Sequence, residues 1–325
     1  MRWGSVCTGY GGLDMAATAL LGGDHAWFAD VDTAASKVLA HHWPGVPNLG
    51  DISAVDWSEV EPVDGLTGGT PCQDLSAAGK RAGMRAGTRS GLWHAMCDAI
   101  EVLRPRLVLW ENVRGALSAG SDSALEPCPG CLGVGDDGPV LRALGRVLGD
   151  LADLGYDAVW CGLPASAVGC AHQRWRVFVA ACPRADAASL GRGSKGRDDR
   201  VRAAGLEPRD QSPRPEPAGG RDLSAGRAAG PGVDWREYTA AIRQHELMIG
   251  RPAPAPTIVG QRGGPKLSPW FTEWLMGLPA GLITGVPGLS VNDQLRLCGN
   301  GVVRQQAIAA YRYLLPLLDS GEVAS

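Results

Sequence analysis

The stretch SVCTGYGGLDMAATALL, residues 5–21, places a short apolar run, a glycine-rich turn and a helical pattern next to one another. Ser5–Thr8 forms the end of a strand, and apolar residues in Leu13–Leu21 recur at helical spacing. The glycines between them let a ligand approach the backbone, and the start of a helix favours electron-rich groups. The stretch therefore predicts the first strand–helix unit of an α/β fold with a ligand at its turn.

The same alternation of short apolar runs and helical patterns continues to about residue 180. Such alternation is typical of βαβ units and a mostly parallel sheet. Two later runs, Tyr156–Leu163 and Arg176–Ala181, can pair as an antiparallel hairpin at the edge of that sheet. The second strand is expected at Ala26–Ala29, and a short third strand is expected to end at Gly50–Ile52. Two more strands are expected at Val63–Thr67 and Leu107–Trp110. The helices are expected at Ala34–His42, Leu92–Leu103 and 140–154.

The second half of the chain is organised differently. Residues 183–232 consist mainly of Gly, Pro, Arg, Asp and Ala, with almost no large apolar residues, so we expect a long loop or a disordered segment there. Helical patterns return at 234–249, structure resumes at 267–278, and Asp293–Leu318 predicts one or two helices.

Composition limits the class of protein without naming a partner. The chain of 325 residues has a formal charge of -3 and no apolar run approaching the roughly 18 residues of a membrane span. Its nine cysteines are scattered, which favours reduced thiols in a cytosol. We therefore expect a protein that stays in the compartment where it is made.

Acidic residues follow two of the predicted strands. Asp30 lies 18 residues after Gly12, close to the spacing of about 20 expected for a carboxylate that binds ribose hydroxyls. Asp51 is placed to accept a hydrogen bond from an adenine amino group. Asp14 stands where a dinucleotide fingerprint needs glycine, which disfavours a nicotinamide site. The pattern predicts an adenosine pocket, although by itself Asp30 could be a solvated loop residue.

Two side chains with reactive groups follow the next strands. Cys72 lies on a polar loop after Pro71, where a thiol is more accessible than inside a strand, and Glu111 ends the strand that begins at Leu107. Because the carboxyl ends of parallel strands meet at one edge of a sheet, both residues are expected there. Alone, Cys72 could be merely a small loop residue.

Four motifs in order resemble the DNA cytosine-5 methyltransferase family. They are the Gly-x-Gly-Gly turn at 9–12, Pro71-Cys72-Gln73, Glu111-Asn112-Val113 and Gly299-Asn300-Gly301-Val302, with Arg174-Trp175-Arg176-Val177 resembling the family's Arg-x-Arg element. The resemblance covers about residues 3–182 and 267–318. It implies a Rossmann-like S-adenosylmethionine-dependent methyltransferase fold, with a mostly parallel sheet, an antiparallel edge hairpin and a small target-recognition lobe.

The resemblance also implies a division of the chain and a mechanism. Residues 1–182 would form the catalytic and cofactor-binding domain, 183–266 a partly disordered target-recognition region, and 267–325 a segment returning to the catalytic domain. In this family a cysteine adds to C6 of a cytosine flipped out of double-stranded DNA, and an acid binds N3. The resemblance assigns these catalytic roles to Cys72 and Glu111, with Arg176 on the cytosine O2 and Arg174 supporting Arg176 or a phosphate.

The resemblance carries further contacts over to this chain. The S-adenosyl-L-methionine site would comprise Tyr10, Gly11, Gly12, Asp30, Asp51, Ile52, Gly69, Pro71, Leu92, Asn300 and Val302. The DNA contacts would comprise Gln73, Ser76, Lys80 and Arg81, on a basic glycine-containing loop that could close over DNA, together with Asn112. No metal is expected. The expected protein is a cytoplasmic monomer of a prokaryote or phage, methylating one short DNA sequence, and a cognate restriction endonuclease is an optional partner.

The chain departs from the family pattern at a few positions. Cys7 stands where the family has Phe packed on adenine, and Tyr10 or Trp27 could take over that stacking. His172 replaces a Gln that precedes Arg174. Cys128 and Cys131 have the spacing of half a zinc site, but no second pair of ligands stands at a convincing distance, so a turn is favoured.

Three other functions stay open on the sequence. A related enzyme could methylate cytosine in transfer RNA by the same chemistry. A DNA-binding protein could retain an inactive methyltransferase scaffold, although Cys72 and Glu111 are both present. A nicotinamide oxidoreductase is a more distant alternative.

Overall fold

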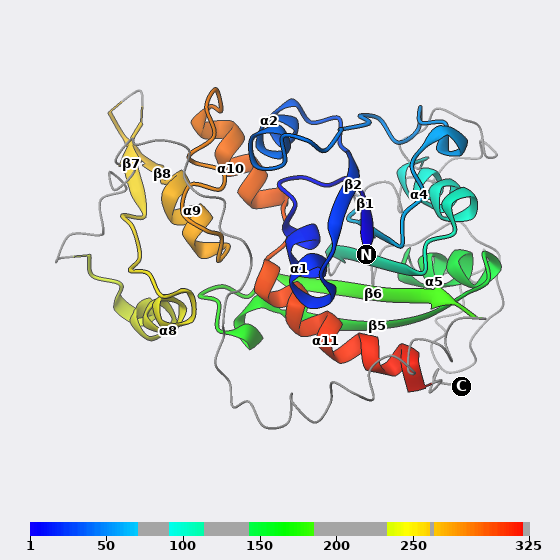
Figure 1. Ribbon diagram of the computed structural model, residues 1–325. Coiled ribbons are helices and arrows are strands. Elements are labelled where there is room, and N and C mark those ends of the chain that lie inside the picture. Colours follow the sequence, from blue (N-terminus) through cyan, green and yellow to red (C-terminus); the bar gives the residue numbers. More distant parts are fainter. Residues whose placement is uncertain (71–90, 114–142, 185–232, 261–262, 321–325) are drawn as a thin grey trace, which may run out of the picture.

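The computed structural model describes residues 1–70, 91–113, 143–184, 233–260 and 263–320. Within these ranges, a central sheet carries helices on both faces, and a smaller group of elements lies beside it (Figure 1). The loop after Thr70, the segment 114–142 and most of the polar stretch 183–232 are outside the described residues, so the predictions made for them are not examined by the structure.

The sheet has six strands in the order β2-β1-β3-β4-β6-β5. The strands β2, β1, β3 and β4 are parallel, and β6 runs antiparallel to both of its neighbours. The predicted mostly parallel sheet with an antiparallel pair is therefore confirmed. The bounds are β1 Arg2–Val6, β2 Asp24–Ala29, β3 Gly65–Gly68, β4 Leu107–Val113, β5 Tyr156–Pro164 and β6 Trp175–Pro183.

The predicted third strand, ending at Gly50–Ile52, is wrong. Only one parallel bridge forms, between Phe28 and Asn48, through the Phe28 amide to the Pro47 carbonyl at 2.9 Å and the Leu49 amide to the Phe28 carbonyl at 2.7 Å. Pro47 has no amide to donate, and Gly50 adopts a left-handed φ of 77°, which turns the chain away from β2. The apolar pattern is real here, but the backbone cannot continue the ladder.

Helices cover both faces of the sheet and bury its side chains in two layers. On one face α1 (Gly12–Leu21) and α11 (Arg304–Ser320) pack on Leu109 and Phe178. On the other face α4 (Gly91–Leu103) and α5 (Ala143–Asp153) pack on Trp110. Because successive strand residues point to opposite faces, Leu109 and Trp110 belong to different layers. Helix α11 packs on α1, β5 and β6, so the C-terminal part of the chain returns to the sheet formed by its N-terminal part (Figure 1).

A smaller lobe contains the remaining elements. The predicted helix at 234–249 is a short 3₁₀ turn, Arg236–Tyr238, followed by α8. Trp235, Phe271 and Trp274 stack in its core, with ring centroids 5.6 Å apart in each successive pair. The lobe's elements are α8 (Thr239–Ile249), β7 (Thr257–Val259), β8 (Pro265–Leu267) and α9 (Pro269–Leu275).

Two further helices join this lobe to the sheet. Helix α10 (Val291–Asn300) packs on α9 and on α2 (Thr33–His42), which follows β2. Residues 301–303 are not helical and separate α10 from α11, so the predicted segment Asp293–Leu318 forms two helices. Short 3₁₀ turns also occur at Trp57–Glu59 and Ala165–Val168.

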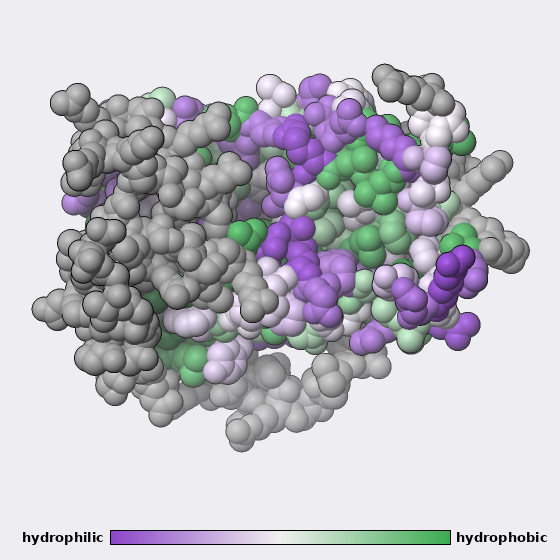
Figure 2. All heavy atoms as spheres, turned by 180° about the vertical axis from the view of Figure 1, so that it is seen from behind, coloured by the Kyte–Doolittle hydropathy of each residue, from purple (hydrophilic) through white to green (hydrophobic). Residues whose placement is uncertain are grey.

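The outer surface is mixed in character. Figure 2, which shows the face opposite that of Figure 1, has hydrophilic and hydrophobic residues side by side. Among the described helices, none combines the length and the apolar character that a membrane span requires.

Candidate active site

The predicted site residues gather at the carboxyl edge of the four parallel strands. The turn after β1, Asp30 after β2, Gly69 and Thr70 after β3, and the last residues of β4 all lie at this edge because the strands run in the same direction. The C-terminal motif after α10 lies at the same edge, because Val302 accepts a hydrogen bond from Tyr10 in the turn after β1. Five segments that are distant in the sequence therefore converge.

The glycine turn and Asp30 are joined directly. Gly9 has a left-handed φ of 59°, and its amide donates to Asp30 Oδ2 at 2.7 Å. The amide of Asp32 donates to the other carboxylate oxygen at 2.8 Å. Partial burial raises the pKa of Asp30, whereas the Gly9 amide and the Arg296 cation lower it. The carboxylate is thus held in a fixed orientation beside an uncapped helix N-terminus, that of α1.

Tyr10 packs beneath the C-terminal motif instead of facing outward. Its side chain is fully buried, its hydroxyl donates to the Val302 carbonyl at 2.5 Å, and burial raises its pKa well above the usual value. Gly12 and Gly301 are needed for this contact, because a Cβ on Gly301 would lie 1.8 Å from the Tyr10 ring and one on Gly12 2.5 Å from the Val302 carbonyl oxygen. Any cofactor contact by Tyr10 would come from its backbone.

The neighbouring predicted cofactor residues differ in exposure. Asp51 is exposed, and hydrogen bonds from the Ser53 hydroxyl and amide, at 2.7 and 2.9 Å, lower its pKa. Ile52 is buried in the core, with Leu92 of α4 packed against the same core. Asn300, the last residue of α10, is exposed.

The family resemblance expects an aromatic ring at Cys7, and Tyr10 or Trp27 was predicted to substitute for it. Tyr10 and Trp27 are both buried, and the Trp27 indole donates to the Glu61 carbonyl at 3.0 Å. Cys7 itself is half-buried at the end of β1, with a left-handed φ of 51°.

Glu111 forms a buried ion pair with Arg176. The Arg176 Nε lies 2.8 Å from Glu111 Oε1, and the side chains are only 13% and 9% exposed. Glu111 faces Phe178 across the β4–β6 ladder, so Arg176, two residues earlier on β6, is its diagonal neighbour on the same face. Burial raises the pKa of Glu111 to about 7, although Arg176 and Arg174 lower it. The carboxyl group can therefore gain or lose a proton near neutral pH.

The strand next to Glu111 anchors the start of the loop that carries Cys72. Asn112 donates to the Thr70 carbonyl at 2.7 Å, and the Trp110 indole donates to the Thr70 hydroxyl at 3.0 Å. Asn112 was predicted to contact DNA, but its amide nitrogen is engaged here and the residue is buried. A Cβ on Gly69 would lie 3.6 Å from the Glu111 carboxylate, so β3 and β4 end close together.

Arg174 binds the C-terminal motif. Its guanidinium donates to the carbonyls of Gly299 at 2.8 Å and Gly301 at 2.6 Å. Partial burial lowers the pKa of Arg174 most, and the positive charge of the nearby Arg176 lowers it further. The sequence predicted support for Arg176 or a phosphate contact, whereas the structure places Arg174 as a tie between β6 and the segment after α10. His172, which precedes it, has a ring nitrogen 2.9 Å from the Leu275 carbonyl.

Several predicted site residues cannot be placed. Pro71, Cys72, Gln73, Ser76, Lys80 and Arg81 lie outside the described residues, as do Cys128 and Cys131. Within the described part of the chain, no group of three or more His, Cys, Asp or Glu side chains is arranged to hold a metal ion.

Other residues at this edge were not predicted. Thr70 had a weak signal, since it immediately precedes Pro71. Gln306 had none: it is fully buried in α11, and its amide donates to the carbonyls of Leu163 at 2.6 Å and Arg174 at 2.8 Å. Asp32 and Arg296, which pair across the edge, were also missed. Their partners lie too far away in the sequence for a local pattern to reveal.

An α/β fold with acidic, glycine-rich and arginine-containing segments at one strand edge is typical of proteins that bind nucleotide cofactors. Within that class, a family model described as C-5 cytosine-specific DNA methylase matches residues 1–195. The match covers more than half of the chain, and the chain belongs to this family.

Individual relatives each match a little more than half of the chain. A DNA N-6-adenine-methyltransferase of Escherichia phage P1 is 33% identical over 226 residues, covering 57% of this chain and 29% of that protein. The type II methyltransferase M.HgiBI of Herpetosiphon aurantiacus is 30% identical over 181 residues, covering 55% of this chain and 36% of that protein. The matched part thus spans about a third of the length of these curated relatives.

A solved structure extends the likeness of fold to nearly the whole chain. The crystal structure of S. pombe Dnmt2 methyltransferase superposes with a TM-score of 0.58 and covers 98% of each chain, at 14% identity. This likeness concerns the fold. It agrees with the predicted Rossmann-like architecture.

Proposed function

We propose that this protein transfers a methyl group from S-adenosyl-L-methionine to C5 of cytosine in double-stranded DNA at a specific short sequence. The observation that carries the proposal is Glu111, a buried carboxyl group with a pKa of about 7, paired with Arg176 at the edge from which the Cys72 loop departs. Such a group can bind N3 of a cytosine as a proton donor while a thiolate attacks the ring.

The residues at the glycine turn fit the methyl donor. A Cβ at Gly9 would meet nothing within 4 Å, so space lies against the backbone there. Beside that space, Asp30 offers a fixed carboxylate for ribose hydroxyls, and Asp51 an exposed one for an amino group. The uncapped start of α1 adds electropositive amides. The donor would supply an electrophilic sulfonium methyl group. Further contacts are proposed for Gly11, Gly12, Ile52, Gly69, Pro71, Leu92, Asn300 and Val302.

Cys72 is the proposed nucleophile. It is two residues beyond Thr70, which Asn112 and Trp110 fix to the end of β4, and two residues span at most about 7 Å. With this reach, the Cys72 thiol would lie close to Glu111. The thiolate sulfur would add to C6, forming an S–C6 bond while the C5–C6 double-bond electrons move toward C5 and N3.

Glu111 and Arg176 would control the charge produced by this addition. Glu111 would donate its proton to N3, and Arg176, whose Nε lies 2.8 Å from the carboxylate, would stabilise the Glu111 anion and contact the cytosine O2. C5 would then form a bond to the methyl carbon as the methyl–sulfur bond of the donor breaks, and the electron pair of that bond would stay on the sulfur, leaving S-adenosylhomocysteine. Loss of the C5 proton to a base, return of the N3 proton to Glu111 and departure of the Cys72 thiolate restore the aromatic ring.

The DNA would have to present its cytosine outside the helix, because C6 is inaccessible in the base stack. We propose that Gln73, Ser76, Lys80 and Arg81 contact the flipped nucleotide's surroundings. Residues 1–182 would carry the chemistry, 183–266 would recognise the target, and 267–325 would complete the cofactor site. A monomer suffices for this arrangement, and a restriction endonuclease could accompany it without being required.

Methylation of adenine is a second candidate, because the relative from phage P1 bears the name of an N-6-adenine methyltransferase. The match covers only 29% of that relative. An exocyclic amino group needs no covalent activation by a thiolate, so adenine methylation would leave Cys72 without a role. The favoured proposal is the one that uses both Cys72 and Glu111.

Nucleoside analysis decides between these products. DNA from cells expressing the chain would be digested and examined by mass spectrometry, with bisulfite sequencing to locate the sites and Cys72→Ala as control. The proposal expects 5-methylcytosine at one short motif, absent with Cys72→Ala. N6-methyladenine would replace the proposal with its alternative, and 5-methylcytosine made by Cys72→Ala would refute the nucleophile.

A trapping assay tests the covalent step, and with matched RNA it tests the substrate. A duplex with 5-fluorocytosine at the target position cannot lose a proton from C5, so the S–C6 bond should persist once the methyl group is transferred. We expect a protein–DNA adduct that survives denaturing electrophoresis and requires Cys72. Transfer to RNA in preference to the DNA duplex would contradict the proposed substrate.

A further inference from the structure

Asp32 is a junction beside the proposed ribose carboxylate. Its amide donates to Asp30 Oδ1 at 2.8 Å, while its own side chain caps α2 by accepting from the amides of Ala34 at 2.8 Å and Ala35 at 3.1 Å. Any force that moves Asp32 therefore moves both the start of α2 and the amide that orients Asp30.

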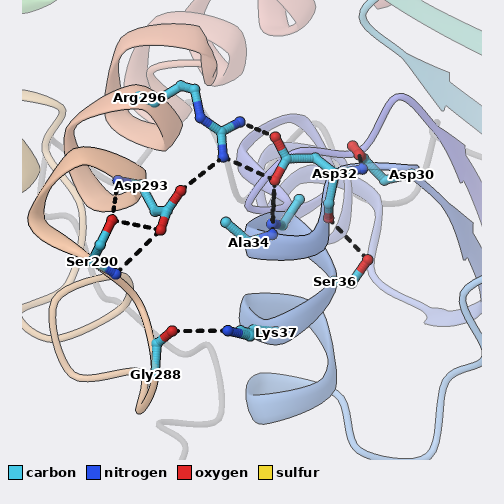
Figure 3. A network of polar contacts seen from close by, with 10 residues as sticks. Asp30, Asp32, Ala34, Ser36, Lys37, Gly288, Ser290, Asp293 and Arg296 are labelled. Carbon is cyan, nitrogen blue, oxygen red and sulfur yellow. Dashed lines mark hydrogen bonds and ion pairs between the residues drawn. The ribbon is translucent and has the colours of Figure 1, made fainter.

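Arg296 of α10 reaches this junction from the other end of the chain. Both terminal nitrogens of its guanidinium bind the Asp32 carboxylate, and one also donates to Asp293 at 3.1 Å (Figure 3). Asp293 is itself fixed by the capping box with Ser290 at the start of α10. A second tie, from Lys37 of α2 to the Gly288 carbonyl at 2.8 Å, runs parallel to the first.

The same helix reaches the cofactor edge at its other end. Helix α10 ends at Asn300, and the following Gly301 and Val302 pack on Tyr10. Arg174 holds the carbonyls of Gly299 and Gly301 in this position. Helix α10 is thus fastened to the glycine turn by its last residues and to the Asp30 segment by Arg296.

We propose that Arg296 is a positioning residue for the cofactor site, acting through Asp32 to hold Asp30 and the end of α10 in one arrangement. This inference rests on the proposed function, because it takes Asp30 as a ligand of the methyl donor. Arg296 contacts Asp32 and not the reacting atoms, so its effect should appear in binding of the donor and little in the chemical step.

Electrostatics support the geometry. Burial raises the pKa of Asp30, and the Arg296 cation is among the groups that lower it. The other charged groups in this network are Asp32 and Lys37 on α2 and Asp293 on α10. An ionised carboxylate accepts hydrogen bonds on both oxygens, whereas a protonated carboxyl group loses part of that accepting capacity. Removing Arg296 should therefore raise the pKa of Asp30 further and weaken donor binding at acidic pH first.

The test is a double-mutant cycle on the binding of S-adenosylhomocysteine, measured by calorimetry with the full chain. Arg296→Gln removes the cation, and Asp32→Asn removes the anion while retaining a good helix cap. We expect each single variant to bind about fivefold more weakly, the effect of one partly exposed ion pair. The double variant should bind no more weakly than either single one. Arg312→Gln, an exposed site on α11, is the matched control and should bind like the wild type.

The pH dependence separates positioning from a general loss of stability. In Arg296→Gln, but not in Arg312→Gln, the acidic limit of binding should move to higher pH. The inference would be overturned if the losses of affinity in the two single variants added up in the double variant, or if the acidic limit of binding did not move in Arg296→Gln. As long as the wild type binds S-adenosylhomocysteine, the proposed function would stand in either case. If Arg296→Gln does not fold, Asp32→Asn carries the test alone, and unchanged affinity in that variant would again overturn the inference. A wild type that neither binds nor methylates would refute the proposed function itself.

Discussion

Two predicted site carboxyl groups have pKa values that are shifted in opposite directions. Glu111, at the end of β4, is buried, and its pKa rises to about 7 despite two neighbouring arginines. Asp51, three residues after the bridge that Asn48 makes with Phe28, is exposed, and hydrogen bonds from Ser53 lower its pKa. Burial decides the difference, because removal from water disfavours the charged form more than an adjacent cation restores it. One group is suited to donate a proton and the other to accept hydrogen bonds.

The largest expected effect is the loss of kcat when the carboxyl group of Glu111 is replaced by an amide, which cannot titrate; the same replacement at Asp51 serves as the comparison. Glu111→Gln keeps the shape of the side chain but cannot deliver a proton to N3, so we expect kcat to fall by about 100-fold or more. Asp51→Asn should instead weaken cofactor binding and leave kcat within a few fold. Steady-state kinetics with a cognate DNA duplex separates the two. Equal losses of kcat in both variants would erase the distinction.

Stability should also distinguish the two groups. The pKa of Glu111 is about 7 in the folded protein and 4.5 ordinarily, so between these values the folded state binds more protons and stability falls as pH rises. The fall amounts to about 3 kcal/mol over this window. Urea unfolding at several pH values should show that Glu111→Gln removes this component of the slope. Asp51→Asn should retain it, since the pKa of Asp51 lies below the window, and an unchanged slope in Glu111→Gln would contradict the assignment.

Arg176 tests what the buried ion pair contributes. Arg176→Met removes a charged hydrogen-bond donor from the proposed cytosine contact, so kcat should fall by about 10-fold to 100-fold. The cation also lowers the pKa of Glu111, and without it the protonated form persists to higher pH. The alkaline limb of the kcat profile should therefore move upward in Arg176→Met. A limb that stays in place would mean that another group sets it.

Local patterns predicted the sheet and the convergence of the site, because strand, turn and helix signals lie within a few residues of one another. The position of Glu111 followed from the direction of the parallel strands. The ion pair of Glu111 with Arg176 could not be predicted in the same way, because the diagonal position of Arg176 depends on the register between β4 and β6. Gln306 and Arg296 gave no signal because their partners are more than a hundred residues away. The false strand before Asp51 arose because periodicity does not register a missing proline amide.

The smallest expected effect is a change in cofactor affinity when Cys7 is replaced. Cys7 is half-buried at the end of β1, and the nearby Tyr10 and Trp27 rings are buried and engaged elsewhere. Cys7→Phe would provide the aromatic face that the family places on adenine, worth about 1 kcal/mol, so cofactor affinity should rise about fivefold. The left-handed φ of 51° at this position is uncommon for any residue other than glycine. Calorimetry with S-adenosylhomocysteine measures the change, and kcat should stay the same because Glu111 is untouched. Weaker binding by Cys7→Phe would mean that adenine does not lie against this residue.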